Sequence, residues 1–308
     1  MTCSPVCRQQ AQAAVRRHIL SALSESLGEG LLARRTCALL SGRGGVLSDQ
    51  PKLHWAMLAL ASCASASGGD WQPAVPLAAS AECLARAMDV IDDLEEDDAA
   101  LWPGFPNREA LLNAAIALLT FSFVCLKDDR SGFAKTADHL PLALLRAGAG
   151  QQTEVEAGQE LDLRGAVGVA RQKSGGFTAA ICSAGARLGG ADDRLARLYY
   201  VYGFHVGMMC QLIDDVVDFP EDLARGRSSV PVAYYRERAR LHASVTGSGT
   251  GPSGKMADET WREAARSYAW LLALVHRRRA LRALRWIERH RPAAAYLSGC
   301  LSLDKRPA

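Results

Sequence analysis

The 308-residue sequence predicts an all-α protein that forms a single domain over residues 1–308. Segments rich in Ala and Leu carry apolar residues at intervals of three and four, which is the period of an amphipathic helix. Alternating apolar and polar residues, which would indicate a half-buried strand, are hard to find. Clusters of Gly and Pro, as at 68–76 and 103–106, divide the chain into pieces of helical length.

These breaks define the expected helices in chain order. Their ranges are 8–27, 51–68, 76–98, 107–127, 139–163, 165–189, 192–219, 228–242 and 258–300. The Gly- and Ser-rich stretch 246–254 separates the last two, and its composition is typical of a flexible linker. We therefore expect a flexible loop over 244–258.

Composition and charge limit the class of protein. The chain is 49% hydrophobic with a net charge of +3, its central part is acidic and its two ends are basic. Nine scattered cysteines, an odd number without zinc-ligand spacing, predict free thiols and a cytoplasmic location. The N-terminus lacks the apolar core of a signal peptide, and the nearly apolar run 55–66 is too short to span a bilayer. No nucleic-acid-binding motif is present.

Two acidic patches on expected helices carry the functional signal. The first acidic patch consists of Asp89, Asp92, Asp93 and Glu96. The second acidic patch consists of Asp214, Asp215 and Asp218, with Gln211 one turn earlier. Spacings of one, three and four place the members of each patch on one side of a helix, beside apolar residues. Asp is unfavourable inside helices and like charges one turn apart repel, so these positions need another explanation.

Hard divalent cations provide that explanation. Mg²⁺ binds one or two carboxylates and fills its remaining positions with water and phosphate oxygens. Two such helices facing one another would hold a substrate diphosphate through Mg²⁺. When the C–O bond of an allylic diphosphate breaks, charge grows on the leaving diphosphate, and metal ions and oriented donors stabilise it. The two patches therefore predict a Mg²⁺-dependent enzyme that ionises an allylic prenyl diphosphate.

Five motifs in order resemble the trans-isoprenyl diphosphate synthase (polyprenyl synthetase) family. Besides the two patches they are Gly158-Gln159-Glu160-Leu161-Asp162-Leu163, Lys173-Ser174-Gly175-Gly176 and Arg227-Ser228-Ser229-Val230-Pro231-Val232. The resemblance covers roughly 76–235 and implies an isoprenoid-synthase helical bundle with a central active-site cavity. It also implies a homodimer.

The resemblance further implies roles for individual residues. Metal ligands would be Asp92, Asp93, Glu96, Asp214, Asp215 and Asp218. Lys173 and Arg227 would contact the diphosphate, and Gln211 and Asp162 would line or support the cavity. The expected catalytic residues are Lys173, Gln211, Asp93 and Asp215.

The sequence departs from the family where an acceptor diphosphate would bind. Chain-elongating members carry Gly-Lys-x-x-Arg-Pro near the N-terminus and an Arg-Arg pair after the first aspartate motif. Here the corresponding stretches read Pro51-Lys52-Leu53-His54-Trp55 and Ala99-Ala100-Leu101-Trp102-Pro103-Gly104, without arginine. Without that bidentate fork a second diphosphate would be held weakly.

Three functions therefore remain open. Segments 89–98, 100–102 and 107–115 resemble the ComQ-type prenyltransferases, which prenylate a tryptophan of a peptide. The leading hypothesis is therefore a prenyltransferase with an acceptor other than isopentenyl diphosphate, or a relaxed chain-elongating enzyme. A terpene cyclase acting on geranyl, farnesyl or geranylgeranyl diphosphate is the alternative, since it needs no second diphosphate. A non-catalytic subunit of a heteromeric synthase would be expected to lose metal aspartates, and this chain keeps six carboxylates.

Overall fold

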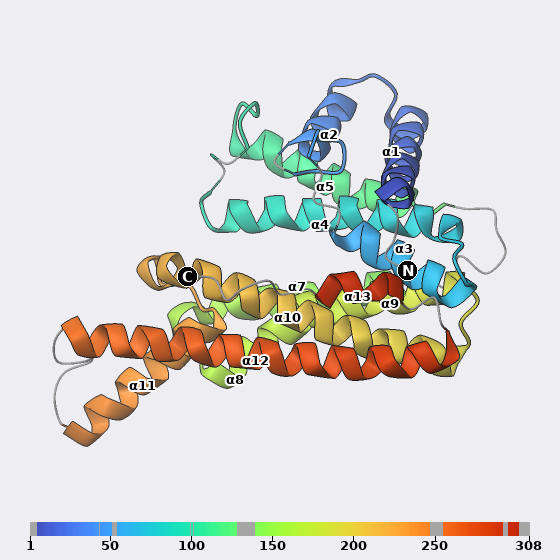
Figure 1. Ribbon diagram of the computed structural model, residues 1–308. Coiled ribbons are helices and arrows are strands. Elements are labelled where there is room, and N and C mark those ends of the chain that lie inside the picture. Colours follow the sequence, from blue (N-terminus) through green and yellow to red (C-terminus); the bar gives the residue numbers. More distant parts are fainter. Residues whose placement is uncertain are drawn as a thin grey trace. The chain divides into compact units, whose positions relative to one another are not determined.

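Helices make up the regular structure of this computed structural model, and its described residues contain no strand (Figure 1). The described residues are 5–42, 44–50, 54–98, 100, 102–127, 139–246, 255–291 and 295–301. The all-α fold class is thereby confirmed for this part of the chain. No helix within these ranges is both long and apolar enough to cross a bilayer.

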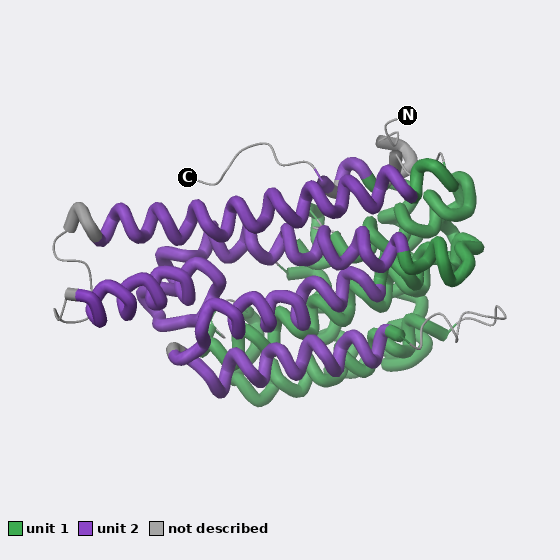
Figure 2. Tube along the Cα trace, turned by 90° about the horizontal axis from the view of Figure 1, so that it is seen from below, with its two compact units in different colours: residues 1–139, 181–197, 287–297 green, residues 140–180, 198–286, 298–308 purple. Residues whose placement is uncertain are grey.

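The chain folds into two compact units, drawn in different colours in Figure 2. Unit 1 comprises 1–139, 181–197 and 287–297, and unit 2 comprises 140–180, 198–286 and 298–308. The first acidic patch belongs to unit 1 and the second to unit 2. That the chain acts as one domain over 1–308 stays a prediction.

In unit 1 the helix α4 (Val75–Glu95) is central, because it contacts α1 (Pro5–Leu27), α2 (Leu31–Ser41), α3 (His54–Ser67) and α5 (Arg108–Val124). A short 3₁₀ turn, η1 (Gln72–Ala74), leads into α4, and a proline in the first turn suits a helix start. The inner side of α4 is made largely of small and aliphatic residues. This lets the neighbouring helices approach α4 closely.

A buried carboxyl group joins α3 to α4. The Oε1 atom of Glu82 accepts a hydrogen bond of 2.6 Å from the backbone N–H of Ala56, in the first turn of α3. The first N–H groups of a helix have no partner within the helix, so an acceptor there is stabilising. Burial raises the pKa of Glu82 to about 8, although hydrogen bonds from the Ala56 and Trp55 backbone and the charge of Arg86 act to lower it.

Unit 2 contains most of the long helices α10 (Asp193–Arg225) and α12 (Lys255–His290), which lie side by side in Figures 1 and 2. The rings of His205 and His276 join them, with their Nδ1 atoms 3.0 Å apart. Helix α11 (Val230–Thr246) packs on α12 through the stacked rings of Tyr234 and Tyr268.

The remaining elements of unit 2 precede α10. They are α7 (His139–Ala157), the 3₁₀ turn η3 (Gly158–Glu160), α8 (Leu163–Ala170) and a π turn, η4 (Arg171–Gly175). Helix α9 (Gly176–Leu188) follows and continues into unit 1. The last elements within the described residues are α13 (Ala295–Ser298) and η6 (Gly299–Leu301).

Several expected boundaries were wrong. Helix α2 was not expected at all, and the single helix expected over 165–189 is two helices joined by the π turn. Helix α10 continues past 219 through Pro220 to Arg225. Of the loop expected at 244–258, residues 244–246 belong to α11 and 255–258 to α12, while 247–254 lie outside the described residues.

Candidate functional site

The first acidic patch occupies the C-terminal end of α4. Asp92 and Asp93 are partly buried there, and the Oδ1 atom of Asp92 is shielded from solvent. The helix ends at Glu95, and Asp97 has a left-handed backbone with φ of 64°. Glu96 is therefore an exposed residue at the helix end rather than a member of the helical stripe, which corrects the expected helix to 98.

Trp102 orients the carboxylate of Asp93 in this patch. Its indole Nε1–H donates a hydrogen bond of 2.7 Å to Oδ2 of Asp93, and the ring is 7% exposed. The guanidinium of Arg86 lies over the same ring, 5.2 Å from its centre, and 3.7 Å from the carboxylate of Asp89. Burial raises the pKa of Asp89, while Arg86 lowers it and the charge of Asp93 raises it further. The role of Trp102 was not predicted, because it follows from a tertiary contact.

The arginines near this patch already have partners. Arg86 also donates a hydrogen bond of 3.1 Å to the carbonyl of Gly42. Arg108, at the start of α5, contacts the carboxylate of Asp97 and the carbonyl of Leu94, where it closes the C-terminal end of α4. Both guanidinium groups therefore support the end of α4.

The second acidic patch lies on α10, and Asp215 is its buried member. Its Oδ1 accepts a hydrogen bond of 2.9 Å from Nε2 of Gln211, and its Oδ2 accepts one of 3.1 Å from the backbone N–H of Val230. Burial raises the pKa of Asp215 to about 7, against the lowering effect of these two bonds. The charges of Asp222 and Glu154 raise the pKa further. Asp214 and Asp218 are exposed one turn apart.

The π turn before α9 positions Gln211. The Ser174 hydroxyl donates to Oε1 of Gln211, which leaves the amide N–H₂ directed at Asp215. This contact depends on Gly207, because a Cβ atom there would lie 2.4 Å from the carbonyl oxygen of Ser174. The π turn, which interrupts the helix expected over 165–189, is closed by a bond from the Gly176 N–H to the Arg171 carbonyl. Such turns are frequent at functional sites.

Lys173 of the π turn pairs with a carboxylate that was not predicted. Its Nζ lies 2.8 Å from Oε2 of Glu154 on α7, and both side chains are about three-quarters buried. Glu154 also raises the pKa of both Asp215 and Asp222, so it lies near the second patch. Glu154 could not be distinguished in sequence from other acidic residues on α7.

Asp222 extends the second patch by one more turn. It is 8% exposed, and burial raises its pKa, while the Ser229 hydroxyl and Arg227 lower it. The guanidinium of Arg227 lies 3.9 Å from Asp222 and also lowers the pKa of Asp218, which burial and Glu221 raise. The four-residue spacing of 214, 218 and 222 was the signal that could have identified Asp222.

Unit 2 therefore brings together most of the residues predicted for the diphosphate side. Three contacts lie close to one another, namely Lys173 with Glu154, Gln211 with Asp215 and Arg227 with Asp222, and the charges of Glu154 and Asp222 raise the pKa of Asp215. Asp162 has a local role, because its side chain accepts a 2.6 Å bond from Gly165 N–H and caps α8.

The two patches offer only oxygen donors, which is the chemistry that Mg²⁺ prefers. The predicted ligands remain Asp92, Asp93, Glu96, Asp214, Asp215 and Asp218, and both oxygens of Asp215 also accept hydrogen bonds. Within the described ranges, no three or more His, Cys, Asp or Glu side chains converge on one metal position. The donor set thus fits an ion that takes one or two protein carboxylates and completes its shell with substrate and water.

Replacing Trp102 by Phe is expected to weaken Mg²⁺ binding by about 10-fold, because residues that orient a metal ligand contribute 10–100-fold. Phe keeps the ring beneath Arg86 and removes only the N–H that orients Asp93. The measurement is a calorimetric Mg²⁺ titration in the presence of inorganic diphosphate. Trp71→Phe, which removes an indole N–H at the start of η1, is the control, and equal affinities in both variants would contradict the role of Trp102.

Comparison with known proteins identifies relatives along much of the chain. The polyprenyl synthetase family model matches residues 47–234. A heptaprenyl diphosphate synthase component 2 from Bacillus subtilis is 28% identical over 51% of this chain and 50% of its own length. A (2E,6E)-farnesyl diphosphate synthase from Mycobacterium bovis is 29% identical over 56% of this chain and 53% of its length. The chain thus spans about half the length of these curated relatives.

Solved structures share the fold at lower identity. A polyprenyl synthetase from Streptomyces coelicolor A3(2) aligns with a TM-score of 0.74 at 20% identity, covering 96% of this chain and 98% of that one. A decaprenyl diphosphate synthase from Rhodobacter capsulatus aligns with a TM-score of 0.75 at 21% identity, covering 95% and 94%. The expected isoprenoid-synthase fold is confirmed. Because the family model matches well over half of the sequence, the chain belongs to the polyprenyl synthetase family.

Proposed function

We propose that this protein ionises an allylic prenyl diphosphate with Mg²⁺ and transfers the prenyl group to an acceptor. The observation that carries the proposal is that unit 2 places two cations beside the second patch: Lys173 pairs with Glu154, and Arg227 lies near Asp222 and lowers the pKa of Asp218, while Gln211 bonds to Asp215. Family membership and the names of the relatives, which are prenyl diphosphate synthases, support the same chemistry.

Each of these groups has a defined task under the proposal. Bound Mg²⁺ would neutralise charge on the diphosphate, with Asp92, Asp93, Glu96, Asp214, Asp215 and Asp218 as the carboxylates that hold it. Lys173 would exchange its partner Glu154 for a phosphate oxygen and stabilise the charge that grows there as the C–O bond breaks. Arg227 would supply a second cation. Gln211 and Val230 would keep Asp215 fixed, so that the turn of α10 carrying Asp214 is held in place.

The acceptor is the open part of this reaction. The relatives' names favour isopentenyl diphosphate, since they describe enzymes that make longer prenyl diphosphates. Against it, Arg86 and Arg108 near the first patch are engaged with Asp89 and Asp97 and with backbone carbonyls. This favours an acceptor without a diphosphate, which includes a double bond of the substrate itself, as in a terpene cyclase.

Incubation with Mg²⁺ and geranyl, farnesyl or geranylgeranyl diphosphate, with and without isopentenyl diphosphate, tests the proposal. We expect Mg²⁺-dependent release of diphosphate from at least one donor. Longer diphosphates would identify a chain-elongating enzyme, and hydrocarbon from one donor alone would identify a cyclase. Release that never exceeds the rate without protein, for every donor, would contradict the proposal.

The oligomeric state of the protein can be measured in the same experiment. We propose a homodimer in the cytoplasm, in keeping with the family resemblance and the free cysteines at the described positions. The name "component 2" of the relatives from Bacillus subtilis and Geobacillus stearothermophilus supports a second candidate, in which a different chain completes the enzyme. Light scattering of the purified chain, measured beside its activity, distinguishes an active dimer from a chain that needs a partner.

A further inference from the structure

The second half of α12 has an outer side made of arginines and large apolar residues. Successive residues of a helix turn by about 100°, which places all of them within an arc of roughly 120°. Its members are Leu271, Val275, Arg278, Arg279, Arg282, Arg285 and Trp286, which we call the α12 outer surface. The opposite arc is buried against the protein and contains His276, Ala280, Ala283, Leu284 and Ile287.

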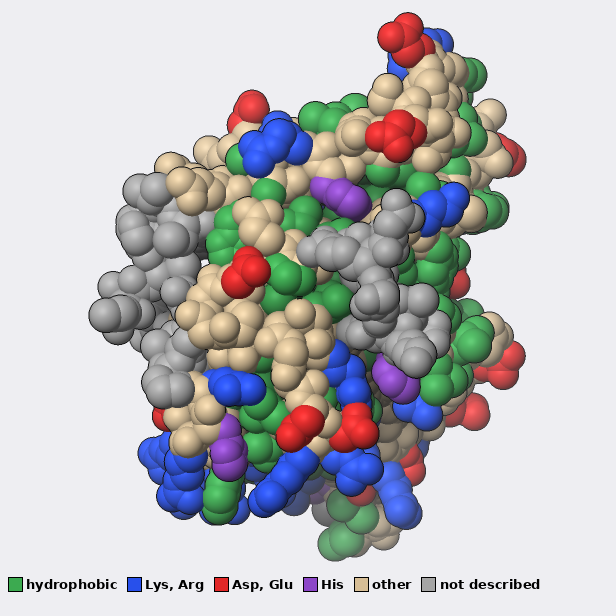
Figure 3. Space-filling view, turned by 90° about the vertical axis from the view of Figure 1, so that its right-hand side faces the viewer, with side chains coloured by type: hydrophobic (Ala, Val, Ile, Leu, Met, Phe, Trp, Pro, Cys, Tyr) green, Lys and Arg blue, Asp and Glu red, His purple; other side chains and the backbone are tan. Residues whose placement is uncertain are grey.

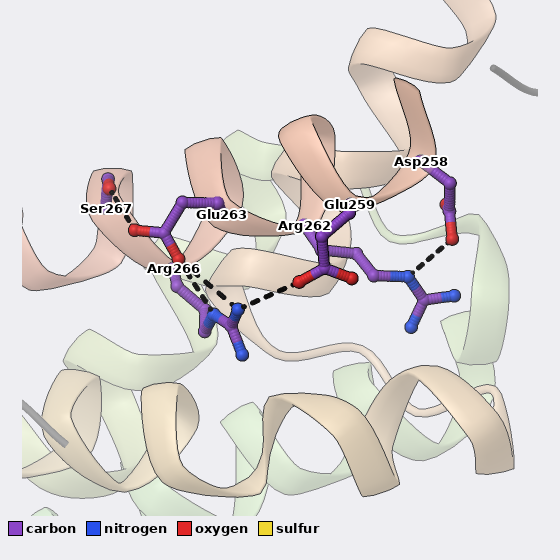
Figure 4. A network of polar contacts seen from close by, with 6 residues as sticks. All are labelled: Asp258, Glu259, Arg262, Glu263, Arg266 and Ser267. Carbon is purple, nitrogen blue, oxygen red and sulfur yellow. Dashed lines mark hydrogen bonds and ion pairs between the residues drawn. The ribbon is translucent and has the colours of Figure 1, made fainter. Parts of the chain in front are cut away.

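The charges on the two halves of α12 are arranged differently. In the first half, Arg262 pairs with Asp258 at 2.7 Å, and Arg266 lies 3.3 Å from Glu263 and 3.5 Å from Glu259 (Figure 4). In the second half, Arg278, Arg279, Arg282 and Arg285 are exposed and form no salt bridge with any part of the chain that the structure describes. Among the described residues, no ion pair therefore neutralises the charge of these four arginines.

The position of these arginines is not explained by stabilisation of the helix end. Cations stabilise the C-terminal end of a helix only within its last turn. Arg278 to Arg285 precede the last residue, His290, by more than one turn. Figure 3 shows several Lys and Arg side chains, with Asp and Glu among them, along the lower part of one face of the molecule.

Large apolar side chains lie among the arginines. Leu271 is 61% exposed, Val275 43% and Trp286 49%. Trp is favoured where one end of a ring meets lipid and the other meets water, and a basic helix surface with exposed Trp and Leu is typical of attachment to anionic membranes. Nucleic-acid binding has no comparable support, because it uses aromatic residues as stacking platforms along a basic groove.

We propose that the α12 outer surface docks on an anionic phospholipid bilayer. The arginines contact lipid phosphates, and Trp286, Val275 and Leu271 enter the headgroup region. The helix lies along the membrane surface, with its buried side still packed in unit 2. Attraction of this kind decreases steeply with salt and requires anionic lipid.

Sedimentation with vesicles tests the proposal on the full chain. We expect the protein to sediment with vesicles of equal parts phosphatidylcholine and phosphatidylglycerol, less so as salt rises, and not with phosphatidylcholine alone. The triple variant Arg278→Glu, Arg282→Glu and Arg285→Glu is expected to lose affinity by more than about 100-fold, since each lost arginine costs about fivefold and each added glutamate is repelled by the anionic surface. Circular dichroism melting shows whether this variant folds.

A matched variant controls for net charge. Arg194→Glu, Arg197→Glu and Arg238→Glu reverse three exposed arginines on α10 and α11 and are expected to keep vesicle binding to within a few-fold. Equal losses in the two triple variants would overturn the proposal, as would equal binding to pure phosphatidylcholine. Retention of an RNA or DNA duplex without binding to vesicles would also overturn it. A blue shift of tryptophan fluorescence on anionic vesicles, absent in Trp286→Phe, is the expected sign that Trp286 enters the lipid.

Discussion

Replacing Asp93 by Asn is expected to reduce prenyl-diphosphate ionisation by about 10²–10³-fold, the cost of removing one oriented group that stabilises a transition-state charge. Asn has nearly the shape of Asp and still offers an oxygen to the Trp102 N–H, which donates to Asp93 at 2.7 Å. The substitution therefore removes the negative charge and leaves the end of α4 in place. The measurement is the rate of diphosphate release as a function of Mg²⁺ concentration.

Glu95→Gln is the matched control for Asp93→Asn. It removes one negative charge from an exposed position two residues further along the same helix, outside the first acidic patch. We expect activity within a few-fold of the original protein, because an exposed charge contributes little. Loss of activity in both variants, or in neither, would contradict the assignment of Asp93 as a metal ligand.

The second large effect concerns stability and arises at Glu82. Its pKa is raised from 4.5 to about 8 by burial, so between these values the folded carboxyl group holds a proton that the unfolded one has released. Stability falls with pH wherever the folded state binds more protons. The contribution of Glu82 is therefore complete below pH 4.5 and lost as the pH rises to about 8. One pKa unit corresponds to about 1.4 kcal/mol, so the total change is a few kcal/mol.

Urea unfolding at several pH values between 5 and 9 measures this effect, as the difference between the original protein and Glu82→Gln. Gln keeps an oxygen for the Ala56 N–H and does not titrate, so this difference should change steadily with pH. Glu237→Gln, at an exposed site on α11, should give a nearly constant difference. A constant difference for Glu82→Gln as well would show that its carboxyl group titrates normally.

The helices were predictable where apolar periodicity is long. Helices α4, α5, α7 and α10 begin within a residue or two of their expected starts. Helix α2 was missed because it is only 11 residues long and is bordered by Gly30 and Gly42, so the glycines obscured its period. Helix α10 continues beyond 219 although Pro usually disrupts a helix, so its end was placed too early.

The site was predictable in its charged residues and not in their partners. Two carboxylate patches at helical spacing are visible in the sequence, as is a lysine beside a Ser-Gly-Gly interruption. Contacts such as Trp102 with Asp93 or Glu154 with Lys173 join residues of different segments, and spacing along the chain carries no information about them. Likewise, exposed Asp214 and buried Asp215 are neighbours in sequence, and only the packing of α10 separates their roles.

Because of the π turn at 171–175, the structure of this segment should be disturbed more by the insertion or deletion of a residue than by a substitution. The turn contains one residue more than an α-helical turn. This extra residue sets how far α8 is rotated relative to α9 about the helix axis. Glycines fix the far side of this junction: a Cβ at Gly175 would lie 2.9 Å from the ring of Phe204, and one at Gly185 2.4 Å from the carbonyl oxygen of Ala59. Deleting a single residue here would turn α8 by about 100° relative to α9. In homologous chains, length changes between Ala170 and Gly176 should therefore be far rarer than amino-acid substitutions.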